Sequence, residues 1–295
     1  PCYEDKVRRI GFRIGDLQKR RFMEKKLAFV LRLKNDTLTK LYGHEPFDEE
    51  AILDEYMGYA ERLDPYIRDI YPIVQDALQG GKQILLEGAQ GVMLDIDLGT
   101  YPYVTSSAPT AGGSCTGSGI PPSRISKTVG VFKAYTTRVG YGPFPTELTN
   151  SLGEYLREHG GEFGTVTGRA RRTGWFDVNI ARYSVNTNGI DSIVLTKLDV
   201  LDELETVKVA VEYDSKGETW DHPIANISHL KHCEPRYVEM RGWQQPLRDC
   251  RSWEDLPANA QAYVERLEEL CGAPIDAISV GPDREHTVVR RPIIV

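Results

Sequence analysis

The sequence predicts an α/β fold built around a mostly parallel sheet, with a helical section at its beginning. Two observations carry this prediction. Short apolar runs of strand length alternate with segments in which apolar residues recur at helical spacing. Several of these apolar runs end in glycine or polar residues, as buried parallel strands do where they lead into loops. Apolar residues make up 40% of the 295 residues, which is enough for a buried core.

The first eighty residues are predicted to be mainly helical. Residues 4–20 are rich in charge and are expected to be extended or loop-like. Apolar residues at helical spacing and acidic residues in a first turn then favour helices. Three helices are expected, over residues 22–42, 48–62 and 66–77.

The remaining residues are predicted to alternate between strands and helices. Strands are expected over 83–88, 128–135, 192–196, 207–213, 219–220 and 277–280. Helices are expected over 150–159, 175–188 and 257–271. Ligands bind outside the carboxyl ends of the strands in such sheets, so the turns after strands are candidate ligand loops. They lie at Gly88, at 196–199 and at Gly281, and the first opens a long loop over 88–122.

Charge and cysteine content exclude several classes of protein. A net charge of −7 argues against a general nucleic-acid binder, so any anion site must be local. The five cysteines are scattered and form no CxxC pair, which is typical of reduced thiols in a cytosolic protein. No apolar window is long enough to span a membrane. We therefore expect a cytoplasmic protein that binds neither nucleic acid nor membranes.

An arginine-rich loop is the first candidate site. Arg169, Arg171 and Arg172 fall within four residues, in a stretch that also contains Gly168 and Gly174. Arginine offers a rigid fork of donors that meets carboxylate or phosphate two bonds at a time, and glycine lets the backbone approach a ligand. The alternative is a solvated basic loop.

The turn at 196–199 is the second candidate site. Its sequence, Thr-Lys-Leu-Asp, follows a predicted buried strand. The carboxylate of Asp199 could accept the paired N–H donors of a guanine base, while the stem of Lys197 lies over the purine face. The alternative is a simple polar exit from the strand. Asp95 and Asp97 could form a metal or acid–base pair, but nothing near them completes a mechanism, so loop acids remain the simpler interpretation.

Several stretches together resemble the adenylosuccinate synthetase family, and the resemblance runs along the whole chain. The stretches lie at 87–107, 110–113, 116–119, 142–148, 167–175, 195–202 and 281–284. The resemblance implies a ligase of purine synthesis that joins IMP and L-aspartate into adenylosuccinate. GTP is its co-substrate, Mg²⁺ its metal and a homodimer its working form, on a P-loop-related α/β sheet.

The resemblance also implies site residues, matched motif by motif. IMP-binding positions are Arg9, Gln90, Thr105, Val139 and Arg169, with Arg9 reaching the IMP of the neighbouring subunit. Aspartate-binding positions are Thr165, Val166, Thr167, Gly168, Arg169, Ala170 and Arg171. GTP-binding positions are Arg171, Lys197, Leu198, Asp199, Ser279, Val280 and Gly281. Ala170 departs from the arginine common in relatives, at a position to which we assign no specific contact.

The larger departure is the absence of a G-x-x-x-x-G-K-[ST] phosphate loop or a similar glycine-rich motif. We therefore expect this chain to be the C-terminal part of one synthetase domain, over 1–295. It would comprise a helical section to residue 80 and a sheet over 81–295. The catalytic base, the catalytic histidine and the Mg²⁺ ligands would lie elsewhere, and the chain alone would be inactive. The alternative is a non-catalytic purine-nucleotide-binding module.

Overall fold

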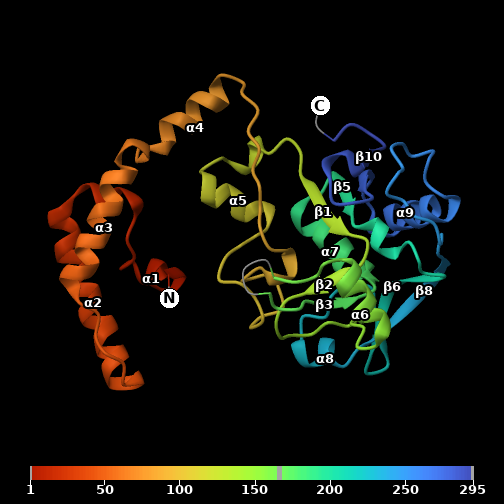
Figure 1. Ribbon diagram of the computed structural model, residues 1–295, viewed down its shortest axis with the longest axis horizontal. Helices are drawn as coiled ribbons and strands as arrows, with labels where there is room; N and C mark the ends of the chain where they lie inside the picture. Colours follow the sequence, from red (N-terminus) through yellow and green to blue (C-terminus); the bar gives the residue numbers. More distant parts are fainter. Residues whose placement is uncertain (1, 165–167, 294–295) are drawn as a thin grey trace. The chain divides into compact units, whose positions relative to one another are not determined.

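The structure is a computed structural model that describes residues 2–164 and 168–293. The chain divides into two compact units, Pro1–Leu85 and Leu86–Val295, and each is described by itself (Figure 1). No helix in the described part of the chain is both long and apolar enough to cross a membrane.

The first unit is helical. Its helices are α1 (Cys2–Arg8), α2 (Arg20–Tyr42), α3 (Glu49–Leu63) and α4 (Ile70–Gln79), with 3₁₀ helices at Ile14–Gln18 and Asp64–Tyr66. The helix α2 packs against α3 through a small core that includes Met23, Leu27 and Leu53. The side chain of Asp48 accepts a hydrogen bond from the amide of Ala51 and so caps α3, which begins where the sequence predicted a helix.

Two predictions for this unit need correction. Residues 4–20 are loop-like only in part: residues 9–13 form no helix or strand, but α1 covers residues 4–8 and a 3₁₀ helix covers Ile14–Gln18. In α1, Glu4 and Asp5 lie in the first turn and Lys6 and Arg8 in the last turn. That charge order favours a helix through its dipole. The fourth helix begins at Ile70 rather than near residue 66, because a 3₁₀ turn precedes it and Asp69 caps it.

The second unit contains the parallel sheet that the sequence predicted. The strands are β1 (Val129–Lys133), β5 (Ser192–Thr196), β9 (Ile275–Ser279) and β10 (Thr287–Val289), in that spatial order. β1, β5 and β9 run parallel, and β10 is antiparallel to β9 at the edge. The prediction of an α/β fold with a mostly parallel sheet is therefore confirmed.

Two smaller sheets complete this unit. β6 (Thr206–Ser215) pairs with β4 (Phe176–Asp177), β7 (Glu218–Trp220) and β8 (Glu234–Arg241), and β2 (Thr136–Arg138) pairs with β3 (Arg172–Gly174). β6 and β7 pair as an antiparallel hairpin, and they lie where strands were predicted at 207–213 and 219–220. The helices are α5 (Ala111–Ser118), α6 (Ser151–His159), α7 (Val178–Asn188), α8 (Ile227–Lys231) and α9 (Ala258–Cys271).

One core joins these sheets. The helix α9 contacts α7, β8 and β9, and it belongs to the blue, C-terminal part of the chain in Figure 1. Its inward face carries Tyr263, Val264 and Leu267, all at most 1% exposed. The predicted amphipathic helix at 257–271 is therefore confirmed, and it fixes the strands whose ends carry the candidate site.

The predicted strand at 83–88 is wrong. These residues belong to no helix or strand, and Leu85 is 82% exposed. A short apolar run becomes a strand only where a neighbouring strand pairs with its backbone. No described strand pairs with it, and the turn at Gly88 therefore does not follow a strand of the sheet.

Candidate functional site

Two of the predicted ligand turns leave the sheet side by side. β5 and β9 are parallel neighbours, with Leu195 opposite Ile278. The turn of residues 197–199 follows β5, and the turn of residues 279–281 follows β9 at the same carboxyl edge. Lys197 has a φ of 61°, in the left-handed region, which bends the chain sharply from β5 into the 3₁₀ helix Leu198–Leu201. Because the sequence analysis predicts that these two turns receive a guanine base, we call them the guanine turns.

Asp199 is the half-buried carboxylate of the first turn. Burial raises its pKa above the ordinary value, and the nearby charges of Lys197 and His286 oppose that shift. A carboxylate that has lost part of its hydration gains more from N–H donors that a ligand presents to it. Asp199 is therefore suited to accept hydrogen bonds from a base.

The second turn is shaped by contacts of its own. The hydroxyl of Ser279 donates to the carbonyl of Gly281 at 2.9 Å, and the amide of Val280 donates to the carbonyl of His286 at 2.8 Å. A Cβ atom on Gly281 would lie 2.5 Å from Nδ1 of His286, so only glycine fits there. Leu198 and Val280 are fully buried beneath the two turns, and their contact with GTP stays a prediction.

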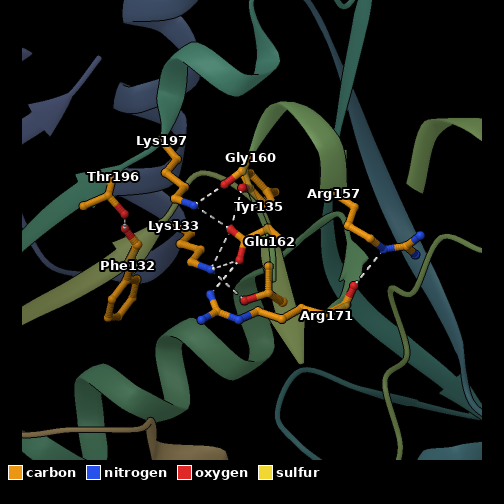
Figure 2. Close-up of polar contacts among 10 residues, drawn as sticks. Phe132, Lys133, Tyr135, Arg157, Gly160, Glu162, Arg171, Thr196 and Lys197 are labelled. Atoms are coloured by element: carbon orange, nitrogen blue, oxygen red, sulfur yellow. Dashed lines mark hydrogen bonds and ion pairs between the residues drawn. The ribbon is translucent and has the colours of Figure 1, made fainter. Parts of the chain in front are cut away.

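A buried carboxylate, Glu162, lies beside the first guanine turn (Figure 2). Its Oε1 accepts hydrogen bonds from Lys197 at 2.9 Å and from the hydroxyl of Tyr135 at 2.7 Å. Lys133 donates to both carboxylate oxygens, at 2.8 and 2.9 Å, and Arg171 donates to Oε2 at 2.8 Å. We call these five residues the Glu162 cluster.

Glu162 carries its charge despite having no exposed surface. Burial raises the pKa of this carboxyl, but the hydrogen bonds from Lys133, Tyr135 and Lys197 outweigh burial and lower the pKa to about 2. Burial, in turn, lowers the pKa of Lys133. One carboxylate is therefore the partner of three cations, and the cluster has a net positive charge at the carboxyl ends of β1 and β5.

The three arginines of the arginine-rich loop point to different partners. Arg171 belongs to the Glu162 cluster, and its backbone amide also donates to the carbonyl of Glu162 at 2.9 Å. Arg172 forms an ion pair with Glu147. The guanidinium carbon of Arg169 lies 5.9 Å from the ring centroid of Tyr141. Thr165, Val166 and Thr167 lie outside the described residues.

Arg169 also lines a cavity of about 390 Å³ in the second unit. The other lining residues are Tyr103, Gly140, Tyr141, Gly142, Pro143, Arg172, Ile227 and Lys231. Arg138 fixes one wall, because its guanidinium donates to the carbonyl of Tyr103 at 2.9 Å and to the carbonyl of Tyr141 at 3.1 Å. Two guanidinium groups and a lysine make this cavity suited to an anionic ligand with an apolar part.

Asp95 stabilises the backbone of the long loop that begins at residue 88. Asp95 is 2% exposed, and its Oδ1 accepts hydrogen bonds from the amides of Asp97 and Leu98. This arrangement favours the interpretation of Asp95 as a loop acid. Among the described residues, no three His, Cys, Asp or Glu side chains lie close enough together to hold a metal ion.

Comparisons with known proteins decide the family. The family model of adenylosuccinate synthetase matches residues 1–288. Adenylosuccinate synthetase of Thermobifida fusca is 52% identical over 294 residues, which cover 100% of this chain and 69% of the relative. The enzyme of Brachyspira hyodysenteriae is 48% identical over 99% of this chain and 69% of the relative. The chain belongs to the adenylosuccinate synthetase family.

A solved structure agrees with this assignment. The fully ligated adenylosuccinate synthetase of Plasmodium falciparum superposes with a TM-score of 0.93 at 39% identity. The superposition covers 99% of this chain and 69% of the Plasmodium chain. The α/β fold of this synthetase chain is thus that of the family.

The predicted IMP residues of the synthetase chain lie in different settings. Val139 is 52% exposed and directly precedes the cavity residue Gly140. Gln90 is exposed with a φ of 64°, and the hydroxyl of Thr105 lies 3.3 Å from that of Ser107. Arg9 is exposed and belongs to the first unit. The structure places Arg169 at the cavity with Val139 beside it, and it leaves the roles of all five as predictions.

The sequence analysis missed Glu162. No motif marks it, because its partners lie at positions 133, 135, 171 and 197, which come together only through the fold. One signal was available: Glu162 follows Gly160 and Gly161, directly before the arginine-rich loop. A lone acid beside three arginines is a candidate for an internal ion pair.

Proposed function

We propose that this synthetase chain provides the IMP, L-aspartate and guanine recognition of a GTP-dependent ligase. In the proposed reaction, the γ-phosphoryl group of GTP passes to the 6-oxygen of IMP. The amine of L-aspartate then displaces that phosphate and forms adenylosuccinate. The observation that carries the proposal is the pairing of the two guanine turns on neighbouring parallel strands.

Guanine recognition is assigned to the first turn. The carboxylate of Asp199 accepts the N1–H and N2–H₂ donors of the base, which adenine cannot offer in that pattern. The ammonium of Lys197 is held by Glu162 and by the carbonyl of Gly160, so its methylene stem is fixed as a wall for the purine face. Ser279 and Gly281 close the other side of the base.

IMP and aspartate recognition are assigned to the cavity and the arginine-rich loop. Arg169 supplies a guanidinium at the cavity beside Tyr141, where it would meet IMP and the carboxylates of aspartate. Val139, Gln90 and Thr105 complete the IMP contacts, and residues 165–171 form the aspartate loop. Arg171, the last residue of this loop, shares the Glu162 carboxylate with Lys197 of the first guanine turn and is assigned to GTP.

Mg²⁺ neutralises phosphate charge in phosphoryl transfer when it is bound. The described residues offer no side-chain set that fits this ion. We therefore assign no metal ligand to them and route no step of the proposal through the ion.

Three further proposals complete the function. The enzyme is a cytoplasmic homodimer, in which Arg9 reaches the IMP of the partner subunit. It takes IMP, GTP and L-aspartate as substrates. The 295-residue chain alone forms no adenylosuccinate, because its sequence contains no phosphate loop to position the triphosphate.

Calorimetric titration of the chain with GDP, ADP, IMP and AMP tests the proposal. We expect GDP to bind more tightly than ADP, and IMP more tightly than AMP. Equal affinities for GDP and ADP would overturn the guanine assignment. A chromatographic assay for adenylosuccinate, with GTP, IMP, L-aspartate and Mg²⁺ present, tests the last proposal, and steady product formation by the chain would contradict it.

A further inference from the structure

The Glu162 cluster joins three segments that are separate in the sequence. Lys133 ends β1, Lys197 begins the guanine turn after β5, and Arg171 belongs to the arginine-rich loop. Figure 2 shows their cationic groups converging on the carboxylate of Glu162. No other carboxylate is an ion-pair partner of these three cations in the described part of the chain.

The position of Glu162 is itself tightly fixed. Its amide donates to the carbonyl of Arg157 at 2.8 Å, and the Nε of Arg157 donates to the carbonyl of Arg171 at 3.0 Å. A Cβ atom on Gly160 would lie 2.1 Å from the hydroxyl of Tyr135, so the turn before Glu162 packs directly on the cluster. The carboxylate is therefore a rigid anchor rather than a mobile surface acid.

We infer that Glu162 is a positioning residue of the GTP site, which holds Lys197 at the guanine turn and Arg171 at the arginine-rich loop in their binding geometry. The inference rests on the proposed function of these two cations. Without the carboxylate, the three cations would repel one another, and among the described residues Lys197 would keep the carbonyl of Gly160 as its one remaining hydrogen-bond acceptor. The stem of Lys197 would then lose the fixed position that guanine needs.

A double-mutant cycle on GDP affinity tests this inference. The variants are Glu162→Gln, the double variant Lys197→Met/Arg171→Met, and the combination of all three changes. We expect Glu162→Gln to weaken GDP binding by about tenfold or more in the otherwise unchanged chain. In the Lys197→Met/Arg171→Met background the same change should weaken binding less than about twofold, because Glu162 acts through these two cations.

Glu268→Gln is the matched control. The carboxylate of Glu268, on α9, also accepts from several donors: Arg290, Arg291 and the amide of Ile275. Ile275 begins β9, at the end of the strand opposite the guanine turns. Its loss should lower stability without changing GDP affinity. If Glu162→Gln fails to fold, Glu162→Asp keeps the charge but is one methylene too short, and it should still weaken GDP binding.

The possible outcomes distinguish a failure of the proposed function from a failure of the inference about Glu162. If the unchanged chain binds GDP no better than ADP, the proposed function fails, and the inference falls with it. If the unchanged chain prefers GDP but Glu162→Gln and Glu162→Asp bind GDP normally, only the inference fails. An equal loss in both backgrounds would also overturn it, because that result indicates a general structural role.

Discussion

Arg172 and Glu147 form a two-pronged ion pair, in which Nε donates to Oε1 at 2.6 Å and the terminal nitrogen reaches Oε2 at 2.5 Å. Arg172 also donates to the carbonyls of Gly140 and Gly142, so it fixes the backbone at the rim of the cavity. The three arginines of the arginine-rich loop therefore have different structural roles. Arg172 supports the cavity wall, Arg171 joins the Glu162 cluster, and Arg169 lines the cavity.

Arg169→Leu and Arg172→Leu should consequently differ. Arg169→Leu should weaken IMP binding by about 1.5–3 kcal/mol, the range for a charged hydrogen bond. Arg172→Leu should lower the free energy of unfolding by about 1–3 kcal/mol, because it leaves the carboxylate of Glu147 without its partner. Calorimetry with IMP and urea denaturation measure the two effects. The reverse pattern would contradict this division.

Asp199→Ala should weaken GDP binding by about 2–3 kcal/mol and leave IMP binding unchanged, because only guanine uses that carboxylate. Calorimetric titration with both nucleotides measures this difference. Asp221→Ala is a suitable control, since its side chain is 68% exposed and lies outside the guanine turns. An unchanged affinity for GDP in the Asp199 variant would refute the assignment.

GDP affinity should also depend on pH through Asp199. The carboxylate accepts the guanine donors only when it is ionised, and burial raises its pKa. Affinity should therefore be constant at neutral pH and fall on mild acidification, earlier than for an ordinary aspartate. Titrations across this pH range measure the effect. The Asp199→Asn variant should lack this dependence, and a profile identical to that of the unchanged chain would point to another group.

Glu162 should make folding stability sensitive to acid. Its folded pKa of about 2 lies below the ordinary value of 4.5, so the folded state favours the ionised form. This contribution, on the order of 3 kcal/mol, is present above the ordinary pKa and is lost as pH falls toward 2. Urea denaturation over that range should show a shallower decline for Glu162→Gln. An equally steep decline would mean that other acids dominate.

Arg9 should act across the proposed homodimer. We expect both Arg9→Leu and Gln90→Ala to weaken IMP binding when each chain is studied alone. In a mixture, a hybrid dimer has one site with an unchanged Gln90 and an unchanged Arg9 from the partner. Calorimetry of the mixture should therefore recover tight IMP binding at that site. If hybrid dimers form and no tight site appears, Arg9 does not work in trans.

The sequence predicted the sheet well where apolar runs had partners. Residues 192–196 and 277–280 were expected as strands, and β5 and β9 lie there as parallel neighbours. Their polar exits then placed Lys197, Asp199 and Gly281 at one edge. This success follows from simple chemistry, because buried strands need continuous apolar side chains and ligand turns need polar ones.

Other parts could not be predicted, for physical reasons. The run at 83–88 has the composition of a strand, but strand formation depends on a pairing partner that composition does not show. The cluster around Glu162 depends on contacts between Glu162 and residues up to 35 positions away from it. The strand β8 was missed, although exposed and half-buried residues alternate over residues 234–237 and again over residues 238–241, as they do in a strand.

The shared carboxylate of Glu162 limits how this synthetase could evolve a new base preference. A change from guanine to another base would have to replace Asp199, and any accompanying change of Lys197 would release one of three cations from the same anchor. The electrostatic environment of Arg171 would then change as well, although Arg171 lies in a different segment of the chain. Mutations in the two segments should therefore be epistatic, and successful changes of specificity should appear in combination rather than singly.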